Sequence, residues 1–249
     1  GVKIKTTLSL DVQQKAEKIV EEEIEKLKDY NATNAAVVIL DSKTGEILAM
    51  IGSYDFNDEK FGKFNAALGL RQPGSAMKPF TYGLAFEKGY TPSSIFMDVQ
   101  TTFPDQGSKD YVPVNYDGKF RGPVQLRFAL GNSINLPAVK LLAVLGLRDF
   151  LSKLNDLGLT TFAPSDENLR RFGLSLTLGG GETTLLNLTS AFSVLATGGI
   201  KHEISSITDI SDFKGKNIFK KVRTQEKKVF SPEVSFLISH ILSDNNARL

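Results

Sequence analysis

Apolar residues recur at two different spacings along the first fifty or so residues, and each spacing predicts a different element. Between residues 12 and 27 the apolar positions follow one face of a helix: Val12, Ala16, Ile19, Val20, Ile24 and Leu27. This spacing predicts an amphipathic helix, and Asp11 with Gln14 three residues later is typical of a capping box at its start. The short runs Ala35–Leu40 and Glu46–Ile51 instead predict two antiparallel strands.

The rest of the chain alternates between helical runs and polar, irregular segments. Residues 54–64 are polar and irregular and predict a surface segment without regular structure. Asp98–Pro123 is rich in Gly, Pro, Asp and Asn, which favours a long functional loop. The expected helices are Val124–Leu130, Pro137–Leu145, Arg148–Leu157, Leu185–Ala196 and Val234–Leu242, and a second hairpin is expected from Ile204–Ile210 and Ile218–Val222. Because there is neither an internal repeat nor a low-complexity linker, the pattern predicts a single α+β domain over residues 1–249.

Composition removes several classes of function. A formal net charge of +2 gives no electrostatic case for a nucleic-acid partner. The absence of cysteine excludes a disulfide scaffold and a thiolate zinc site, and the two distant histidines, His202 and His240, argue against a histidine metal site and a Ser-His-Asp hydrolase. We therefore expect no metal and no cofactor. No apolar run reaches the roughly 18 residues of a membrane helix, so this segment itself is expected to be soluble.

Candidate chemistry lies in Arg71–Phe80, where a Pro-Gly turn precedes a serine and a lysine three residues apart. On a helix such residues share a face with Cβ atoms about 5–6 Å apart, so the Lys78 amine can reach the Ser75 hydroxyl and take its proton. Pro79 falls early enough in the expected helix that its missing N–H costs little. The segment predicts an activated serine nucleophile with a lysine base.

The same spacing also arises by chance, so Ser75 needs support from its surroundings. Ser211-Asp212-Phe213-Lys214 has the spacing too, but it lies in a polar stretch between two alternating apolar runs and predicts a hairpin turn. The expected partner of Ser75 is Asn132–Val139, which contains Ser133 and Asn135.

Together, the Pro-Gly-Ser-x-x-Lys-Pro-Phe element and Asn132–Val139 resemble the active site of penicillin-binding transpeptidases, most closely the class A enzymes that cross-link bacterial peptidoglycan. The resemblance continues through Asp41–Met50, Asn115–Gly118 and Leu178–Thr184. It implies an α+β penicillin-binding, serine β-lactamase-like transpeptidase fold, with an antiparallel sheet and an all-helical subdomain.

The resemblance also implies a role for each site residue. Ser75 would be acylated by the D-alanyl-D-alanine end of a peptidoglycan stem peptide or by a β-lactam antibiotic, and Lys78 would be its base. Ser133 would pass a proton to the departing amine, and Asn135 would bind the substrate amide and order Lys78. The resemblance further implies a membrane-anchored parent protein with a glycosyltransferase domain, acting on the extracytoplasmic side of the bacterial membrane.

Three motifs define this family, S-x-x-K, S-x-N or S-D-N, and K-T-G, in that order. Ser243-Asp244-Asn245 spells the second motif but follows an apolar helical run far from Ser75, so we prefer Ser133. Lys43-Thr44-Gly45 spells the third, but it precedes Ser75 and bridges the first two expected strands as a turn. No K-T-G follows Ser133, so the domain is expected to be incomplete at its C-terminal end and to acylate slowly on its own.

Two other functions remain open from the sequence. A serine β-lactamase-like hydrolase would share Ser75 and Lys78, but Asp166-Glu167-Asn168 does not have the Glu-x-x-x-Asn spacing of class A β-lactamases. The other is a non-catalytic scaffold or ligand sensor of the same fold, and the missing K-T-G is its best support. Gly179-Gly180-Gly181 is not followed by Gly-Lys-Ser/Thr, so it predicts a tight turn rather than a phosphate-binding loop.

Overall fold

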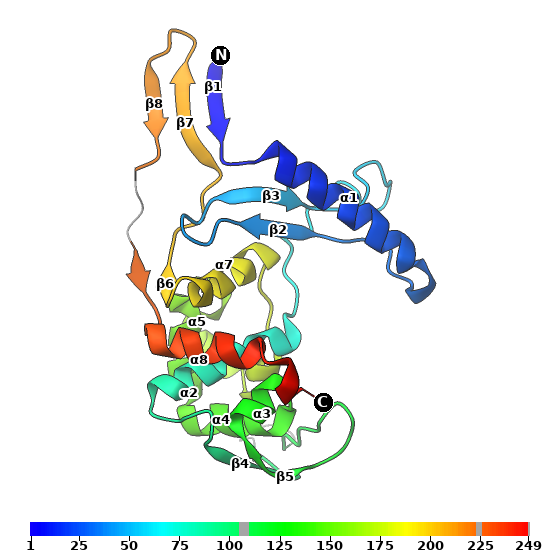
Figure 1. Cartoon of the computed structure of the whole chain (residues 1–249), viewed down its shortest axis with the longest axis vertical. Coiled ribbons are helices and arrows are strands. Elements are labelled where there is room, and N and C mark those ends of the chain that lie inside the picture. Colours follow the sequence, from blue (N-terminus) through cyan, green and yellow to red (C-terminus); the bar gives the residue numbers. More distant parts are fainter. Residues whose placement is uncertain (105–109, 223–225, 249) are drawn as a thin grey trace. The chain divides into compact units, whose positions relative to one another are not determined.

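A computed structural model describes residues 1–104, 110–222 and 226–248, and it shows an α+β protein (Figure 1). The chain forms two compact units. The first contains Gly1–Arg71 and Thr183–Lys228, and the second contains Gln72–Glu182 and Val229–Leu249. The single domain that the sequence predicts stays a prediction, and residues 105–109 of the expected loop lie outside the described residues.

In the first unit, helix α1 (Leu10–Lys26) packs against the antiparallel pair β2 (Val37–Leu40) and β3 (Ile47–Ile51). A small core holds them together: Ala16, Val20, Ile24 and Ile51. The amphipathic helix and the hairpin are therefore confirmed. The expected capping box is wrong, because Ser9, in an extended conformation, is the N-cap, and its hydroxyl accepts from Val12 N.

A second sheet of the same unit has β7 (Ile207–Asp212) between β1 (Val2–Thr6) and β8 (Asn217–Lys220), all antiparallel (Figure 1). The predicted second hairpin is thus confirmed with shorter strands. Strand β1 was not predicted, since all five of its residues are exposed and give no buried face. The unit also contains η1 (Lys28–Tyr30), α7 (Leu185–Ala196), β6 (Ile200–Lys201) and β9 (Lys227–Lys228).

The second unit is mainly helical and is built around α2 (Lys78–Glu87), whose residues 78–86 are all buried. Four helices contact α2: α3 (Leu126–Gly131), α4 (Asn135–Leu145), α5 (Leu147–Asp156) and α8 (Pro232–Leu242). Shorter helical segments complete it: η2 (Gly74–Met77), η3 (Thr160–Phe162), α6 (Asp166–Arg171), η4 (Leu174–Leu178) and η5 (Asn245–Ala247).

This unit also contains the antiparallel pair β4 (Ile95–Asp98) and β5 (Gly122–Gln125). The helix expected at Val124–Leu130 begins later than predicted, because Val124 pairs with Phe96 in this ribbon and α3 starts at Leu126. The expected loop therefore runs between two paired strand ends, which bring Asp98 opposite Gly122.

Candidate active site

Ser75 lies in the 3-10 helix η2, which leads directly into α2. The turn is entered at Gly74, whose φ of +59° suits glycine, and Lys78 N donates to Ser75 O. Pro79 occupies the first turn of α2, as predicted. The Ser75 side chain is exposed, so a substrate can reach its hydroxyl.

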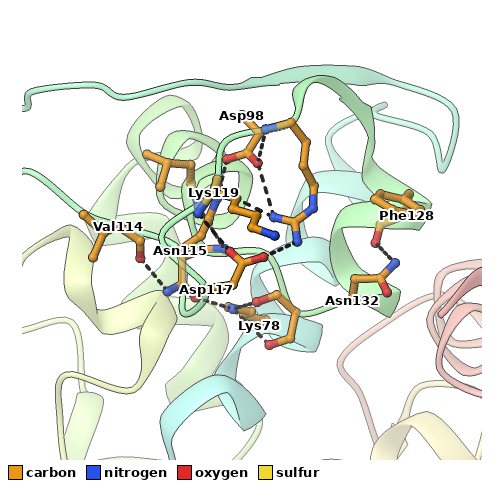
Figure 2. A network of polar contacts seen from close by, with 12 residues as sticks. Lys78, Asp98, Val114, Asn115, Asp117, Lys119, Phe128 and Asn132 are labelled. Carbon is orange, nitrogen blue, oxygen red and sulfur yellow. Dashed lines mark hydrogen bonds and ion pairs between the residues drawn. The ribbon is translucent and has the colours of Figure 1, made fainter. Parts of the chain in front are cut away.

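Lys78 lies below this surface with only 1% of its area exposed. Its Nζ donates to Ser133 O at 2.5 Å, to Ser133 Oγ at 3.0 Å and to Asn135 Oδ1 at 2.7 Å (Figure 2). These bonds use all three donors of the ammonium group. The structure thus brings Lys78, Ser133 and Asn135 together. Among the described residues, no hydrogen bond joins Lys78 Nζ to Ser75, so the expected direct contact is not formed.

Burial lowers the pKa of Lys78 from 10.5 to about 8. The physical reason is that a charged amine loses its hydration inside the protein, which favours the neutral form. A lysine with this pKa is partly neutral near physiological pH, which is the condition for accepting a proton from a hydroxyl.

Ser133 and Asn135 occupy the entry to α4. Ser133 is one of two non-glycine residues with a positive φ among those described, at +54°, and this left-handed conformation places its carbonyl and its hydroxyl on the same ammonium group. Asn135 is the first residue of α4, and its Nδ2 donates to Val114 O at 2.8 Å. Its amide is therefore oriented from both sides, with Oδ1 toward Lys78.

Sequence reasoning gave no role to two residues that hold these elements in place. Gly179 ends η4 in a left-handed conformation and lies against Gly74, whereas the sequence predicts only a tight turn there. Asn115 accepts a hydrogen bond from Asn135 N at 2.9 Å, and the sequence marked it only as part of a segment similar to the family. Both residues lie in segments that carry the family resemblance, but the sequence does not show which distant residues they contact.

The rival motifs have ordinary structural roles. Lys43-Thr44-Gly45 lies in the turn between β2 and β3, where Asp41 Oδ1 accepts from Lys43 N and Thr44 N, so the turn interpretation is confirmed. Ser211–Lys214 spans the end of β7 and the following turn. Ser243 caps the C-terminal end of α8, and its hydroxyl donates to His240 O of the same helix.

The segment near the position of a β-lactamase base also makes ordinary structural contacts. Asp166-Glu167-Asn168 forms the first turn of α6, where Ser165 is the N-cap. Asn168 Nδ2 donates to Thr161 O and Ala163 O, which closes the preceding turn.

Within the described ranges, no group of three or more His, Asp or Glu side chains is arranged to hold a metal ion. The same residues contain no helix that is both long enough and apolar enough to span a membrane.

A sequence model of the family described as "Penicillin binding protein transpeptidase domain" matches residues 35–248, a range that includes all four predicted site residues. This chain belongs to that family.

Curated relatives of this family include penicillin-binding protein 1A from Rickettsia felis, 34% identical over 196 residues, which are 78% of this chain and 24% of the relative. Penicillin-binding protein 1A from Neisseria gonorrhoeae is 38% identical over 179 residues, which are 70% of this chain and 21% of the relative. The chain therefore spans about a fifth to a quarter of the length of these relatives.

Solved structures support the fold. Penicillin-binding protein 1A from Haemophilus influenzae has a TM-score of 0.74 and 29% identity, over 87% of this chain and 35% of that one. The penicillin G acyl-enzyme complex of penicillin-binding protein A from Mycobacterium tuberculosis has a TM-score of 0.76 and 22% identity, over 97% of this chain and 62% of that one. The penicillin-binding transpeptidase fold expected from the sequence is confirmed.

Proposed function

We propose that this chain carries the acyl-transfer site of a peptidoglycan DD-transpeptidase, with Ser75 as the nucleophile. The observation that carries the proposal is the buried Lys78 amine, which is held by Ser133 and Asn135 in the unit that also presents Ser75. A lysine on a solvated face would have neither the burial that lowers its pKa nor three fixed acceptors.

The first half of the reaction follows from these positions. Neutral Lys78 takes the proton of the Ser75 hydroxyl as its oxygen attacks the carbonyl carbon between the two terminal D-alanine residues. Collapse of the tetrahedral intermediate breaks the C–N bond, and the departing D-alanine amine receives a proton through the Ser133 hydroxyl, which Lys78 in turn supplies. The products are an acyl ester on Ser75 and free D-alanine.

The second half reverses the proton path. The amine of a neighbouring stem peptide attacks the ester carbonyl, gives up a proton toward Ser133 and Lys78, and releases the Ser75 oxygen as a hydroxyl. With a β-lactam, the same attack opens the four-membered ring, and the departing nitrogen stays tethered to the acyl group. The antibiotic thus leaves a stable ester on Ser75.

The negative charge on the carbonyl oxygen needs hydrogen-bond donors. Ser75 lies in the first turn of a helical segment that continues to Glu87. Backbone N–H groups in a first turn lack an acceptor within the helix, so the Ser75 N–H is available as one donor. The sequence contains no K-T-G after Ser133 that would provide a second donor. Loss of one such donor typically costs about 10²–10³ in rate, so we expect slow acylation by these 249 residues alone.

The proposed substrate also indicates where in the cell the reaction takes place. Peptidoglycan lies outside the cell membrane, so we propose that the protein acts on the extracytoplasmic side and that its partners are stem peptides and β-lactam antibiotics. The similarity to class A enzymes supports a membrane-anchored protein with a glycosyltransferase activity, and that part of the proposal concerns the complete gene product.

Labelling with a fluorescent penicillin tests the assignment. We expect one adduct per molecule on Ser75, found by intact mass and peptide mapping of the complete gene product, and a slower reaction of the 249-residue chain. The matched control is Ser211→Ala, which removes the serine of the chance S-x-x-K and should leave labelling unchanged. An adduct that persists in Ser75→Ala would contradict the assignment.

A further inference from the structure

The start of α4 is held by a residue twenty positions earlier in the chain. Ile134, the N-cap of α4, makes no capping bond with its side chain. Asn115 Oδ1 instead accepts from Asn135 N at 2.9 Å and from Leu136 N at 3.3 Å. These are N–H groups of the first turn, which have no acceptor within the helix. Asn115 therefore performs, from a distance, the task of an N-cap side chain.

Asn115 is itself fixed from the other side. It is 4% exposed, and its Nδ2 donates to Asp98 Oδ1 at 2.8 Å and to Lys119 O at 2.7 Å. Asp98 is fully buried at the end of β4, and its second oxygen accepts from Arg121 N at 3.0 Å. Every donor and acceptor of the Asn115 carboxamide is thus used, which permits only one orientation of the group.

The segment around Asn115 also holds the side chain of Asn135. Val114 O accepts from Asn135 Nδ2 at 2.8 Å, and this bond turns Asn135 Oδ1 toward Lys78 Nζ. Figure 2 shows Asp98, Asn115, Val114 and Lys78 in one connected network. A continuous path of hydrogen bonds therefore runs from the buried Asp98 carboxylate to the Lys78 amine.

We propose that Asn115 is a positioning residue for acylation: locked on Asp98, it fixes the start of α4 so that Asn135 presents its carboxamide oxygen to Lys78. The proposal rests on the function proposed above. Asn115 acts through Asn135, because its side chain bonds the backbone of Asn135 and has no bond to Lys78 among the described residues.

The charged and titratable groups around this path do not replace Asn135 as the partner of Lys78. Asp98 lies on the path, Lys119 and Arg121 bond to it through backbone atoms, and Tyr82 and Lys140 interact electrostatically with Asp98. Asp117 pairs with Arg121, Arg121 also approaches Asp98, and Lys140 Nζ donates to Met97 O. Tyr82 is buried on α2, and burial raises the pKa of its hydroxyl, so it stays neutral. Loss of the Asn135 acceptor would therefore leave the Lys78 ammonium less stabilised.

Asn115→Ala in the complete gene product tests the proposal, with acylation by fluorescent penicillin measured against pH. We expect the maximal rate to fall about 10²-fold, the size of effect that a misplacement of about 1 Å produces. The midpoint of the pH–rate profile should move below the wild-type midpoint, because the charged form of Lys78 loses a hydrogen-bond acceptor. A purely structural defect would reduce the amount of active protein and leave the midpoint in place.

A double-mutant cycle shows whether Asn115 acts through Asn135. Asn115→Ala should have little further effect on the rate in an Asn135→Ala background, because residues that act through one contact are not additive. The matched control is Asn168→Ala, which removes another asparagine that holds two backbone carbonyls of the same unit. It should change neither the rate nor the midpoint. Additive effects, or an unchanged midpoint, would overturn the proposal.

A milder variant and a second measurement cover the case in which Asn115→Ala does not fold. Asn115→Ser leaves a small polar group in the buried position, and its acylation rate and pH–rate midpoint are measured in the same way. Amide hydrogen exchange should increase selectively at Asn135 and Leu136 in the variant, and unchanged exchange there would overturn the inference even without activity. Failure of wild-type protein to label at Ser75 would instead refute the proposed function.

Discussion

Gly179 lies in direct backbone contact with Gly74, the residue that precedes Ser75. A Cβ atom on Gly179 would lie 2.2 Å from Gly74 N and 2.4 Å from Gly74 Cα. Distances this short leave no room for any side chain, and the obstacle is backbone, which cannot rotate away. The glycine turn after η4 therefore supports the turn that presents Ser75, the proposed nucleophile.

We predict that Gly179→Ala displaces the turn at Ser75 and lowers acylation by at least about 10²-fold, because small misplacements of a nucleophile have effects of this size. Penicillin labelling and thermal melting provide the measurement. Gly89→Ala is the control, since Gly89 has a similar φ of +93° but nothing within 4 Å of an added Cβ. The left-handed strain of about 1–2 kcal/mol is then common to both variants. Equal labelling of the two variants would contradict the packing argument.

The lowered pKa of Lys78 predicts the pH dependence of acylation. If the neutral Lys78 amine acts as the proposed base, the acylation rate should rise with pH with a midpoint near 8. Stability should change in the same range. The folded state has the lower pKa, so the unfolded chain binds more protons between about pH 8 and 10.5, and the free energy of unfolding rises with pH there. In Lys78→Met, denaturant titrations at several pH values should show a smaller rise, whereas an identical rise would argue against a lowered pKa.

Two lysines in sequence motifs should respond very differently to substitution. Lys78→Ala removes the proposed base and should slow acylation by about 10²–10⁴. Lys43→Ala changes an exposed residue of a hairpin turn and should leave the rate within a few-fold of wild type. Circular dichroism checks that both variants fold. A large acylation defect in folded Lys43→Ala would mean that Lys43-Thr44-Gly45 is the functional third motif.

Ser133 combines a proposed role in proton transfer with a left-handed backbone conformation, and substitutions can separate the two. Its φ of +54° is tolerated by glycine at little cost, so Ser133→Gly should be at least as stable as Ser133→Ala. Both variants lose the hydroxyl that contacts Lys78 Nζ, and both should acylate about 10²-fold more slowly or worse. Thermal melting and labelling rates are compared for the pair. Near wild-type labelling of Ser133→Gly would remove Ser133 from the proton path.

The local elements were largely predictable because they depend on short-range patterns. Helical spacing alone identified α1, α4, α5, α7 and α8, and turn residues identified the hairpin at Lys43-Thr44-Gly45. Strand β1 could not be predicted, since its exposed residues have no buried alternation and it exists only through pairing with β7. The start of α3 was misplaced for a similar reason, because pairing with Phe96 makes Val124 part of a strand.

From the sequence, the turn before Ser75, its spacing to Lys78 and the family resemblance around Ser133 and Asn135 predict which residues take part in the chemistry. The contacts of Lys78, its depth of burial and the resulting fall in its pKa follow only from the folded arrangement of the chain. The same arrangement brings Asn115 and Gly179 to their partners. Residue types and short spacings encode reactive groups, but burial and contacts between distant segments arise only when the chain packs, because they depend on all the surrounding atoms.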